Sequence, residues 1–181
     1  MKKYFIKTLF ALSVLTSLSF NGCILDALNT LTQNIPISQE FTISNGILPS
    51  YSQTEIIDLS SSSTYQRYAD KIQSINFVRA EYRTKSVSPA SLSGNITITL
   101  KDMNGNLLFS VPLGQITPAN YQNTPYELTL NAAQISLING YLSTLANKKI
   151  QATLSIDNIS PVPYSLTGVI DIVFEMKVKT N

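Results

Sequence analysis

Hydrophobic and polar residues alternate in several segments of the chain after Glu40. The two-residue period is seen in the segments 41–44, 96–101, 150–157 and 170–179. This period is typical of strands with one buried and one solvated face, and such strands are typical of antiparallel sheets because buried parallel strands are apolar throughout. We therefore expect a mainly β fold: an antiparallel β-sandwich or curved sheet of about seven to eight strands, with two short helices.

The stretch KDMNGNLLF contains the clearest turn signal. Asn104-Gly105 lies between two alternating runs, and both residue types tolerate the positive φ that a type I′ hairpin requires. We expect residues 95–103 and 106–113 to pair. The letters DMNGN also resemble a calcium-binding loop, but the other ligands and the terminal Glu of an EF-hand are missing, so we expect no metal site there.

Two segments have the signals of short helices. In SSSSTYQRYADKI, Ser63 and Gln66 match a capping box, in which each side chain bonds to the backbone N–H of the other residue. Tyr65, Ala69 and Ile72 then share one helical face.

The second helical segment is 132–147, with Asn131 as its N-cap. Apolar residues recur there at helical spacing and predict a buried stripe: Ile135, Ile138, Leu142 and Leu145. Gly140 weakens this helix by about 1 kcal/mol.

The segment INFVRAEYRTK predicts a strand with Val78, Ala80 and Tyr82 on its buried face. Its other face carries a row of charges: Arg79, Glu81, Arg83 and Lys85. This row is either a binding surface or a solvated strand face whose charges meet partners across the sheet, and we favour the solvated face.

Tyrosine is frequent, with nine residues in the chain. Five of them lie near expected element ends or loops: Tyr65, Tyr68, Tyr121, Tyr126 and Tyr164. Such tyrosines either anchor a partner surface or cover the edge of the core with the hydroxyl in water, and we favour the second interpretation.

The N-terminal region has the pattern of an export signal. Residues 1–7 carry three lysines and no acid, and residues 9–20 are mostly apolar. Hydroxyl residues dilute this run, which falls short of the roughly 20 apolar residues of a spanning helix. The alternatives are an uncleaved membrane anchor and cleavage by an ordinary signal peptidase at the small residues Ser17 and Ser19. The single cysteine of the chain, Cys23, follows directly after the run.

The letters SFNGC resemble the lipobox of bacterial lipoproteins, in which a small residue precedes an invariant cysteine. Gly22 matches this pattern, whereas Phe20 and Asn21 stand where Leu and a small residue are usual. The resemblance covers the first 23 residues. It implies that Cys23 is the lipid attachment site, with a diacylglyceryl thioether and an N-acyl chain such as palmitate. It also implies a membrane-anchored place in the bacterial cell envelope, at the outer membrane facing the periplasm or the surface.

We expect three regions: an export signal peptide at 1–22, a lipid-anchored tether at 23–39, and a single β-rich domain at 40–181. The segment 24–39 lacks strict alternation, and Pro36 ends any helix there. The alternative for this segment is a short amphipathic turn beside the membrane.

The apparent basicity of the chain belongs to its N-terminus. The whole chain has 13 Lys and Arg against 11 Asp and Glu, and removing Lys2, Lys3 and Lys7 leaves 10 against 11. We therefore expect no nucleic-acid partner, since such a partner requires clustered cations. A hydrophobic content of 44% argues against a disordered chain.

The sequence carries no catalytic signature. The absence of histidine excludes Ser-His-Asp and Cys-His nucleophilic sites and two-histidine zinc sites. Neither an S-x-x-K pattern nor a glycine-rich phosphate loop occurs. We therefore expect no catalytic, cofactor-binding or metal-binding residue, no cofactor and no enzymatic activity. A carboxylate-based hydrolase would need only two acids at a suitable separation. It is the least favoured hypothesis because the acids mostly occupy outward strand positions or turns among polar neighbours.

These observations favour a non-enzymatic cell-envelope lipoprotein that acts as a structural or protein-binding module. Its expected partners are the membrane, through the lipid anchor, and an envelope protein. The alternative is a carrier of lipid or another hydrophobic ligand, with the helix 132–147 laid along a curved sheet. A filled interior would favour the first hypothesis, a long apolar cavity the second, and a cleft with two facing acids the hydrolase.

Overall fold

The computed structural model describes residues 29–180 of the chain. Within this part the chain forms an antiparallel β-sandwich of eight strands with two short α-helices, which confirms the predicted fold class. The export signal and Cys23 lie outside the described residues.

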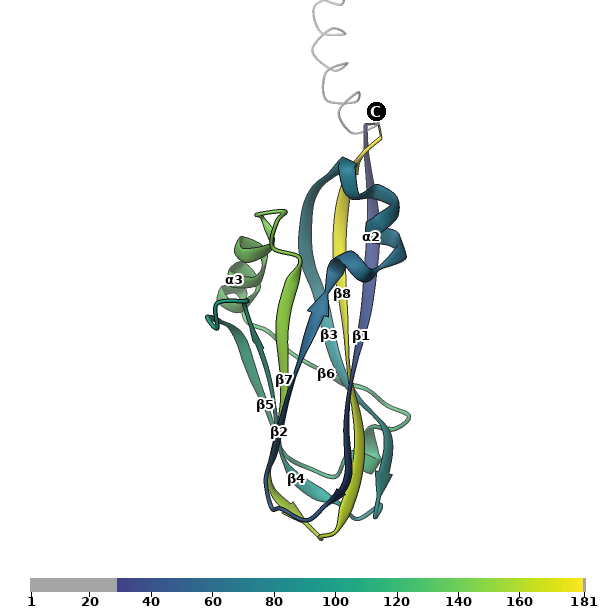
Figure 1. Cartoon of the computed structure of the whole chain (residues 1–181), viewed down its shortest axis with the longest axis vertical. Helices are drawn as coiled ribbons and strands as arrows, with labels where there is room; N and C mark the ends of the chain where they lie inside the picture. Colours follow the sequence, from purple (N-terminus) through teal and green to yellow (C-terminus); the bar gives the residue numbers. More distant parts are fainter. Residues whose placement is uncertain (1–28, 181) are drawn as a thin grey trace, which may run out of the picture.

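Two four-stranded sheets face each other, and every strand pair in them is antiparallel. The first sheet, in the order β1-β8-β3-β6, consists of β1 (Thr30–Gly46), β8 (Tyr164–Lys179), β3 (Ile72–Ser88) and β6 (Tyr126–Glu127). The second sheet, in the order β2-β7-β4-β5, consists of β2 (Tyr51–Asp58), β7 (Lys149–Ser160), β4 (Ser93–Lys101) and β5 (Leu107–Ile116). The first sheet extends beyond the second at the end where β1 begins and β8 ends (Figure 1).

The core lies between the sheets and follows the two-residue period of the sequence. In β7, Ile150, Ala152 and Leu154 are fully buried, and the residues between them are partly exposed. The same alternation buries Ile172 and Phe174 in β8. Burial of these side chains is the main favourable term in the stability of the sandwich.

The domain begins earlier in the chain than we predicted. Residues 30–39 are not a tether but the first part of β1, which pairs with β8 from Thr30 opposite Lys179 onward. Ile35 is fully buried in the core. Pro36 is tolerated in β1 because β1 is an edge strand. The backbone groups on one side of an edge strand have no partner strand, so a residue without an N–H can be accommodated. The predicted boundary at residue 40 is therefore wrong.

The first helix, α2 (Ser63–Tyr68), is not capped as predicted. Its N-cap is Ser62, whose side chain makes no capping bond, and the amide Nε2 of Gln66 donates to the carbonyl of Ser60 at 3.1 Å. The serines before the helix form the 3-10 helix η1 (Leu59–Ser61), which Asp58 caps by accepting from the backbone N–H of Ser60 at 2.9 Å. The cap of η1 thus replaces the predicted box. A second 3-10 helix, η2 (Ala69–Lys71), follows α2.

The second helix, α3 (Ala132–Leu142), begins as predicted and ends early. Asn131 is its N-cap and forms a capping box with Gln134. The helix stops at Leu142, five residues before the predicted end at 147. It packs against β3 and β5, where Ile138 and Leu142 are fully buried. The buried stripe is therefore confirmed, with Ile135 and Leu145 packed at its margin.

One buried position was wrongly assigned in β3. Val78 is 49% exposed, although Ala80 and Tyr82 are fully buried as predicted. A bulge between Phe77 and Arg79 in the pairing with β8 shifts the period at this point, so Val78 turns outward.

The hairpin between β4 and β5 pairs the predicted segments but has another turn. Gly105 has a φ of 87°, whereas Asn104 has no positive φ, so the turn is not type I′. The N–H of Gly105 donates to the carbonyl of Asp102 at 3.1 Å, and the N–H of Asp102 donates to the carbonyl of Asn106 at 2.9 Å. A turn over Met103-Asn104 followed by a left-handed glycine is the usual form of a longer hairpin loop.

Candidate functional site

Three large apolar side chains are exposed at the end of the sandwich opposite the start of β1. They belong to the loop between β1 and β2 and to the loop between β7 and β8, which both lie at this end (Figure 1). Ile47 is 73% exposed, Leu48 64% and Val162 49%. The backbone N–H of Ile159 donates to the carbonyl of Pro49 at 2.9 Å and ties the β1–β2 loop to the end of β7, directly before the β7–β8 loop. We call Ile47, Leu48 and Val162 the apolar tip.

The end of β1 explains how the chain brings these residues outward. Asn45 has a φ of 51°, and the pairing with β8 shifts between Ile43 and Gly46. The N–H of Asn45 leaves the ladder and donates to Oγ of Ser165 at 3.1 Å. Gly46 then passes flat against the ring of Tyr164, since a Cβ at Gly46 would stand 2.5 Å from the ring carbon Cζ. A glycine is needed for this close approach.

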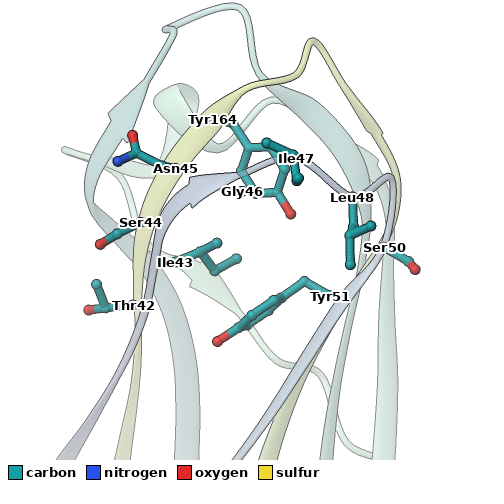
Figure 2. A pocket seen from close by; sticks show the side chains of 10 residues that line it. All are labelled: Thr42, Ile43, Ser44, Asn45, Gly46, Ile47, Leu48, Ser50, Tyr51 and Tyr164. Carbon is teal, nitrogen blue, oxygen red and sulfur yellow. The ribbon is translucent and has the colours of Figure 1, made fainter.

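A hollow of about 370 Å³ lies beside the apolar tip, and Figure 2 shows the side chains around it. Its lining consists of Thr42, Ile43, Ser44, Asn45, Gly46, Ile47, Leu48, Ser50, Tyr51 and Tyr164. The floor is formed by core residues, because Ile43 and Tyr164 are almost fully buried. The rim carries hydroxyl and amide groups.

The hollow has an apolar floor and an uncharged lining. Its lining contains no carboxylate and no cationic side chain. The two tyrosines are its titratable groups, and burial raises the pKa of Tyr164, so this hydroxyl stays neutral near pH 7. The hydroxyl of Tyr51 donates to Oε1 of Gln53 at 2.9 Å and is thereby held in place. An apolar floor with a few fixed polar groups at the rim is the usual composition of a recognition pocket.

A second hollow of about 290 Å³ lies where the loop after α3 approaches the β4–β5 hairpin. Lys148 and Lys149 line it, but both cations have partners. Lys148 lies over the ring of Tyr65 at 5.3 Å from its centre, and Nζ of Lys149 is 3.6 Å from the carboxylate of Asp58. A hydrogen bond from Ser60 to that carboxylate lowers the pKa of Asp58.

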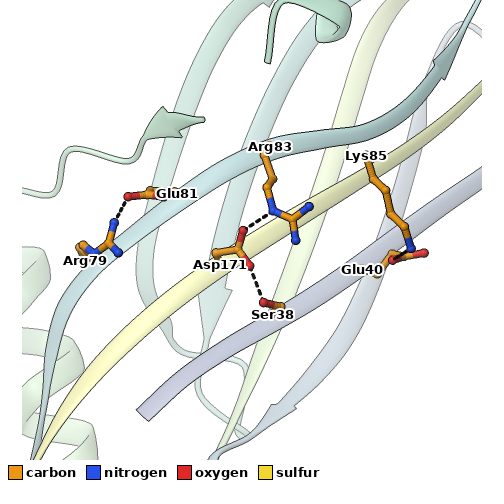
Figure 3. Close-up of polar contacts among 7 residues, drawn as sticks. All are labelled: Ser38, Glu40, Arg79, Glu81, Arg83, Lys85 and Asp171. Atoms are coloured by element: carbon orange, nitrogen blue, oxygen red, sulfur yellow. Dashed lines mark hydrogen bonds and ion pairs between the residues drawn. The ribbon is translucent and has the colours of Figure 1, made fainter. Parts of the chain in front are cut away.

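The row of charges on β3 forms ion pairs on the outer face of the first sheet (Figure 3). Arg83 reaches Asp171 on β8 at 2.6 Å, and Lys85 reaches Glu40 on β1 at 2.7 Å. Arg79 pairs with Glu81 on its own strand. This arrangement agrees with our prediction that the charged row is a solvated strand face whose charges meet partners across the sheet. Exposed pairs of this kind contribute about 0–1 kcal/mol each.

Carboxylates do not line either hollow. Glu81 and Glu127 stand opposite each other where β3 pairs with β6, and cross-strand partners share one face of a sheet. Glu81 is held by Arg79, and Glu127 is exposed. These two acids therefore face solvent next to Arg79, and neither lines a cavity that could hold a substrate.

The loop that resembles a calcium site is a closed hairpin turn. The carboxylate of Asp102 accepts from the N–H groups of Asn104 and Asn106, each at 2.8 Å, and from Nδ2 of Asn106 at 2.7 Å. The bond from Asn106 contributes most to lowering the pKa of Asp102. Across residues 29–180, no group of three or more acidic, cysteine or histidine side chains is arranged to hold a metal ion.

The predicted tyrosines cover the core. Tyr65 and Tyr164 are buried, and three others pack against the core at its edge: Tyr68, Tyr121 and Tyr126. The most buried tyrosine is Tyr82, whose hydroxyl lies 3.0 Å from Oγ1 of Thr84. Burial raises the pKa of Tyr82 to about 12, so this side chain is also neutral at pH 7.

The one predicted site residue, Cys23, lies outside the described residues. In the described part of the chain, no helix is both long and apolar enough to cross a membrane. Sequence reasoning missed the apolar tip, although a signal was present: GILPSY and PVPY place large apolar residues beside prolines in loops. Prolines and turn residues mark loops, and apolar residues in loops are candidates for exposure.

No family model matches the sequence, and no curated protein matches it. Among solved structures, that of Desmodium yellow mottle tymovirus is 12% identical, with a TM-score of 0.40 over 82% of this chain and 84% of that one. The empty head of turnip yellow mosaic virus is 10% identical, with a TM-score of 0.44 over 83% of this chain and 82% of that one. The decameric BFDV capsid protein is 10% identical, with a TM-score of 0.41 over 81% of this chain and 99% of that one. Similarities of this size carry no argument about function.

Proposed function

We propose that the protein is a non-enzymatic lipoprotein of the bacterial cell envelope that is anchored through Cys23 and binds another envelope protein at its apolar tip. The observation that carries the proposal is the exposure of Ile47 and Leu48 at the edge of a hollow without charged side chains, with Val162 exposed in the loop between β7 and β8 at the same end. Exposed apolar groups gathered at one place with a polar rim are typical of interaction sites.

The position of the tip relative to the anchor supports this role. Six residues separate Cys23 from Thr30, so the two residues lie roughly 25 Å apart at most. The end of the sandwich where β1 begins would therefore stay close to the membrane. β1 has 17 residues, which corresponds to roughly 55 Å at about 3.3 Å per residue. The apolar tip would stand at the far end of this length, where a partner in the envelope can reach it.

The hollow favours an apolar side chain of a partner over a reacting substrate. Burial raises the pKa of Tyr164 and keeps its hydroxyl neutral at pH 7, and the lining holds no carboxylate, histidine or cation that could act as a general acid or base. The partner would place an apolar residue against Ile43 and Tyr164 and hydrogen-bond to the hydroxyl and amide groups of the rim. A small site of this kind suits a short segment of the partner.

The packing of α3 supports a module with a filled core over the alternative of a lipid carrier. Ile138 and Leu142 are fully buried and belong to the same core cluster as the inward residues of both sheets. In a carrier we would expect this apolar stripe to border a ligand-filled space.

The anchor is tested by replacing Cys23 with Ala in the full chain, followed by fractionation of a diderm bacterium that expresses it. The unaltered protein should be found in the membrane fraction with an intact mass that includes the acyl chains. The Cys23→Ala variant should lose both the added mass and the membrane association. A variant that stays in the membrane with unchanged mass would contradict lipidation.

The tip is tested by placing a photo-crosslinking amino acid at position 48 in intact cells. We expect a discrete crosslinked protein that disappears when Ile47 is also changed to Ser. Ile56 supplies the matched control, because it is 45% exposed on β2, away from the tip. Crosslinks that survive Ile47→Ser, or that disappear equally with Ile56→Ser, would show that the tip does not bind a specific partner.

A further inference from the structure

Four basic residues gather at the end of the sandwich where the chain enters it. Thr30 at the start of β1 pairs with Lys179 at the end of β8, and Lys177 lies two residues before it on the same face. Arg67 in α2 and Lys71 in η2 lie at this end as well, directly before β3 begins at Ile72, which pairs with Val178 (Figure 1). We call Arg67, Lys71, Lys177 and Lys179 the basic end.

The cations of the basic end differ from those nearer the tip in having no acidic partner. All four are exposed. Among residues 29–180, the four ion pairs involve Arg79, Arg83, Lys85 and Lys149, and none involves a residue of the basic end. Asp70 in η2 and Glu175 on β8 lie at this end too, and Lys101 is a further cation of residues 29–180 without an ion pair. This end therefore concentrates an excess of two positive charges.

This concentration does not follow from net charge. Removing residues 1–28, with Lys2, Lys3, Lys7 and Asp26, changes the chain from 13 basic and 11 acidic residues to 10 of each. A domain with no net charge that carries an excess of cations at one end attracts anions most strongly at that end.

We propose that the basic end rests on anionic phospholipid headgroups and holds the domain upright on the membrane, as a second contact beside the lipid anchor. The inference rests on the proposed anchor for its orientation, because a tether from Cys23 brings this end and no other close to the bilayer. Basic residues beside a membrane anchor are attracted to the negative surface of the bilayer within about a Debye length, roughly 8 Å at physiological ionic strength. Lys177 and Lys179 lie beside the start of β1, the part of the domain that the anchor would hold nearest to the bilayer.

The arrangement of the cations fits a layer of headgroups better than a single anion. They are spread over α2, η2 and the end of β8 and do not converge on one hollow, since none of the four lines either hollow described above. A spread of cations matches the spread of charges on a membrane surface. An upright domain would hold the apolar tip at its greatest distance from the bilayer.

The proposal is tested with the body of residues 29–181, which contains every strand and core residue that the structure describes and therefore carries the contacts that fold it. The body is mixed at low ionic strength with vesicles of phosphatidylcholine alone and with vesicles that contain about a third phosphatidylglycerol. Binding is measured by co-sedimentation. We expect binding to the anionic vesicles only, and we expect it to weaken steeply as salt is raised.

Two charge-matched double variants locate the contact. Lys177→Gln with Lys179→Gln should weaken binding to the anionic vesicles about 20- to 30-fold, since each basic residue near the surface changes affinity about fivefold. Arg83→Gln with Lys85→Gln removes the same formal charge from the paired row on β3 and should change binding less than about twofold. Circular dichroism establishes that both variants are folded.

Three results would overturn the proposal: no binding to anionic vesicles, equal binding to phosphatidylcholine, or equal weakening by the two double variants. Equal binding to phosphatidylcholine would assign the contact to the apolar tip. Because the body lacks Cys23, these results do not depend on lipidation. Fractionation of the Cys23→Ala variant tests the lipid anchor but not the binding of headgroups. Each proposal can therefore be contradicted without contradicting the other.

Discussion

Gly105 is the residue on which the β4–β5 hairpin depends. Its φ of 87° lies in the left-handed region, and a side chain there would meet open space, so only the backbone conformation restricts the residue. Substitution by Val should lower the free energy of unfolding by about 1–2 kcal/mol, because a β-branched residue resists positive φ. Urea unfolding measures the loss. An unchanged midpoint would show that the turn does not need this conformation.

Asp102 and Asp58 predict a loss of stability in acid. Hydrogen bonds in the folded protein lower the pKa of both carboxyl groups below their ordinary values. Their contribution is therefore fully present above the pKa of the unfolded chain, about 3.9, and is lost as the pH falls through the lower pKa of the folded state. Urea midpoints should be level near pH 7 and decline steadily below about pH 4.

The variant Asp102→Asn isolates one of these groups. Asp102 accepts hydrogen bonds from three N–H groups, and an amide at this position would turn an N–H donor toward them. The urea midpoint at pH 7 should therefore fall, and the midpoint should depend less on pH in acid. Asp70→Asn is the control, because Asp70 is exposed in η2. If the two variants have the same pH profile, Asp102 does not contribute as described.

At the scale of elements, α3 is held by its buried side. Leu142→Ala should lower the free energy of unfolding by about 2–5 kcal/mol, because Leu142 is fully buried and truncation leaves a cavity. Leu137 is the control on the same helix, since it is 55% exposed and Leu137→Ala should change little. In the carrier alternative, the body would instead yield stoichiometric lipid on solvent extraction and Leu142→Ala would be nearly as stable as the parent.

The two helices also show how far local signals reach. Asn131 and Gln134 were sufficient to locate the start of α3, because a capping box involves neighbouring residues alone. The end of the helix was predicted too late, since the apolar spacing continues to Leu145 beyond the last helical turn. For α2 the sequence contains a capping pattern at Ser63. In the structure, however, Asp58 caps η1, which includes the preceding Ser60 and Ser61, and the predicted box does not form.

At the scale of the whole molecule, β1 is part of the domain from Thr30 onward. The body of residues 40–181 should therefore be much less stable than the body of residues 29–181, because it lacks the stretch of β1 that pairs with the second half of β8. The loss of buried Ile35 alone is worth about 2–5 kcal/mol. Thermal melting of the two bodies compares them directly. Equal melting temperatures would mean that residues 30–39 do not stabilise the sandwich.

The sandwich also places its two distinctive surfaces at opposite ends. Residues of the basic end surround the start of β1 and the end of β8, whereas the apolar tip follows the end of β1 and precedes the start of β8. One long strand pair, β1 with β8, therefore separates the proposed membrane contact from the proposed partner contact. An anchored molecule of this form would present the tip to its surroundings without a further linker.

The sequence by itself determined the class of the fold, most of the buried positions and the pairing of the β4 and β5 segments. Each of these depends on a local property, namely the two-residue period of a half-buried strand or the turn preference of Asn104-Gly105. It also determined that Cys23 is the one cysteine available for a lipid anchor, while the test of that prediction lies outside the described residues.

Only the tertiary structure decided the features that depend on partners distant in the chain. Residues 30–39 form a strand because they pair with β8, more than a hundred residues away in the chain. From the sequence alone we therefore predicted a tether for this segment. The outward turn of Val78 comes from a bulge against the same strand. The apolar tip and the basic end join residues from the two halves of the chain, and a local pattern cannot show which loops and strand ends meet in space.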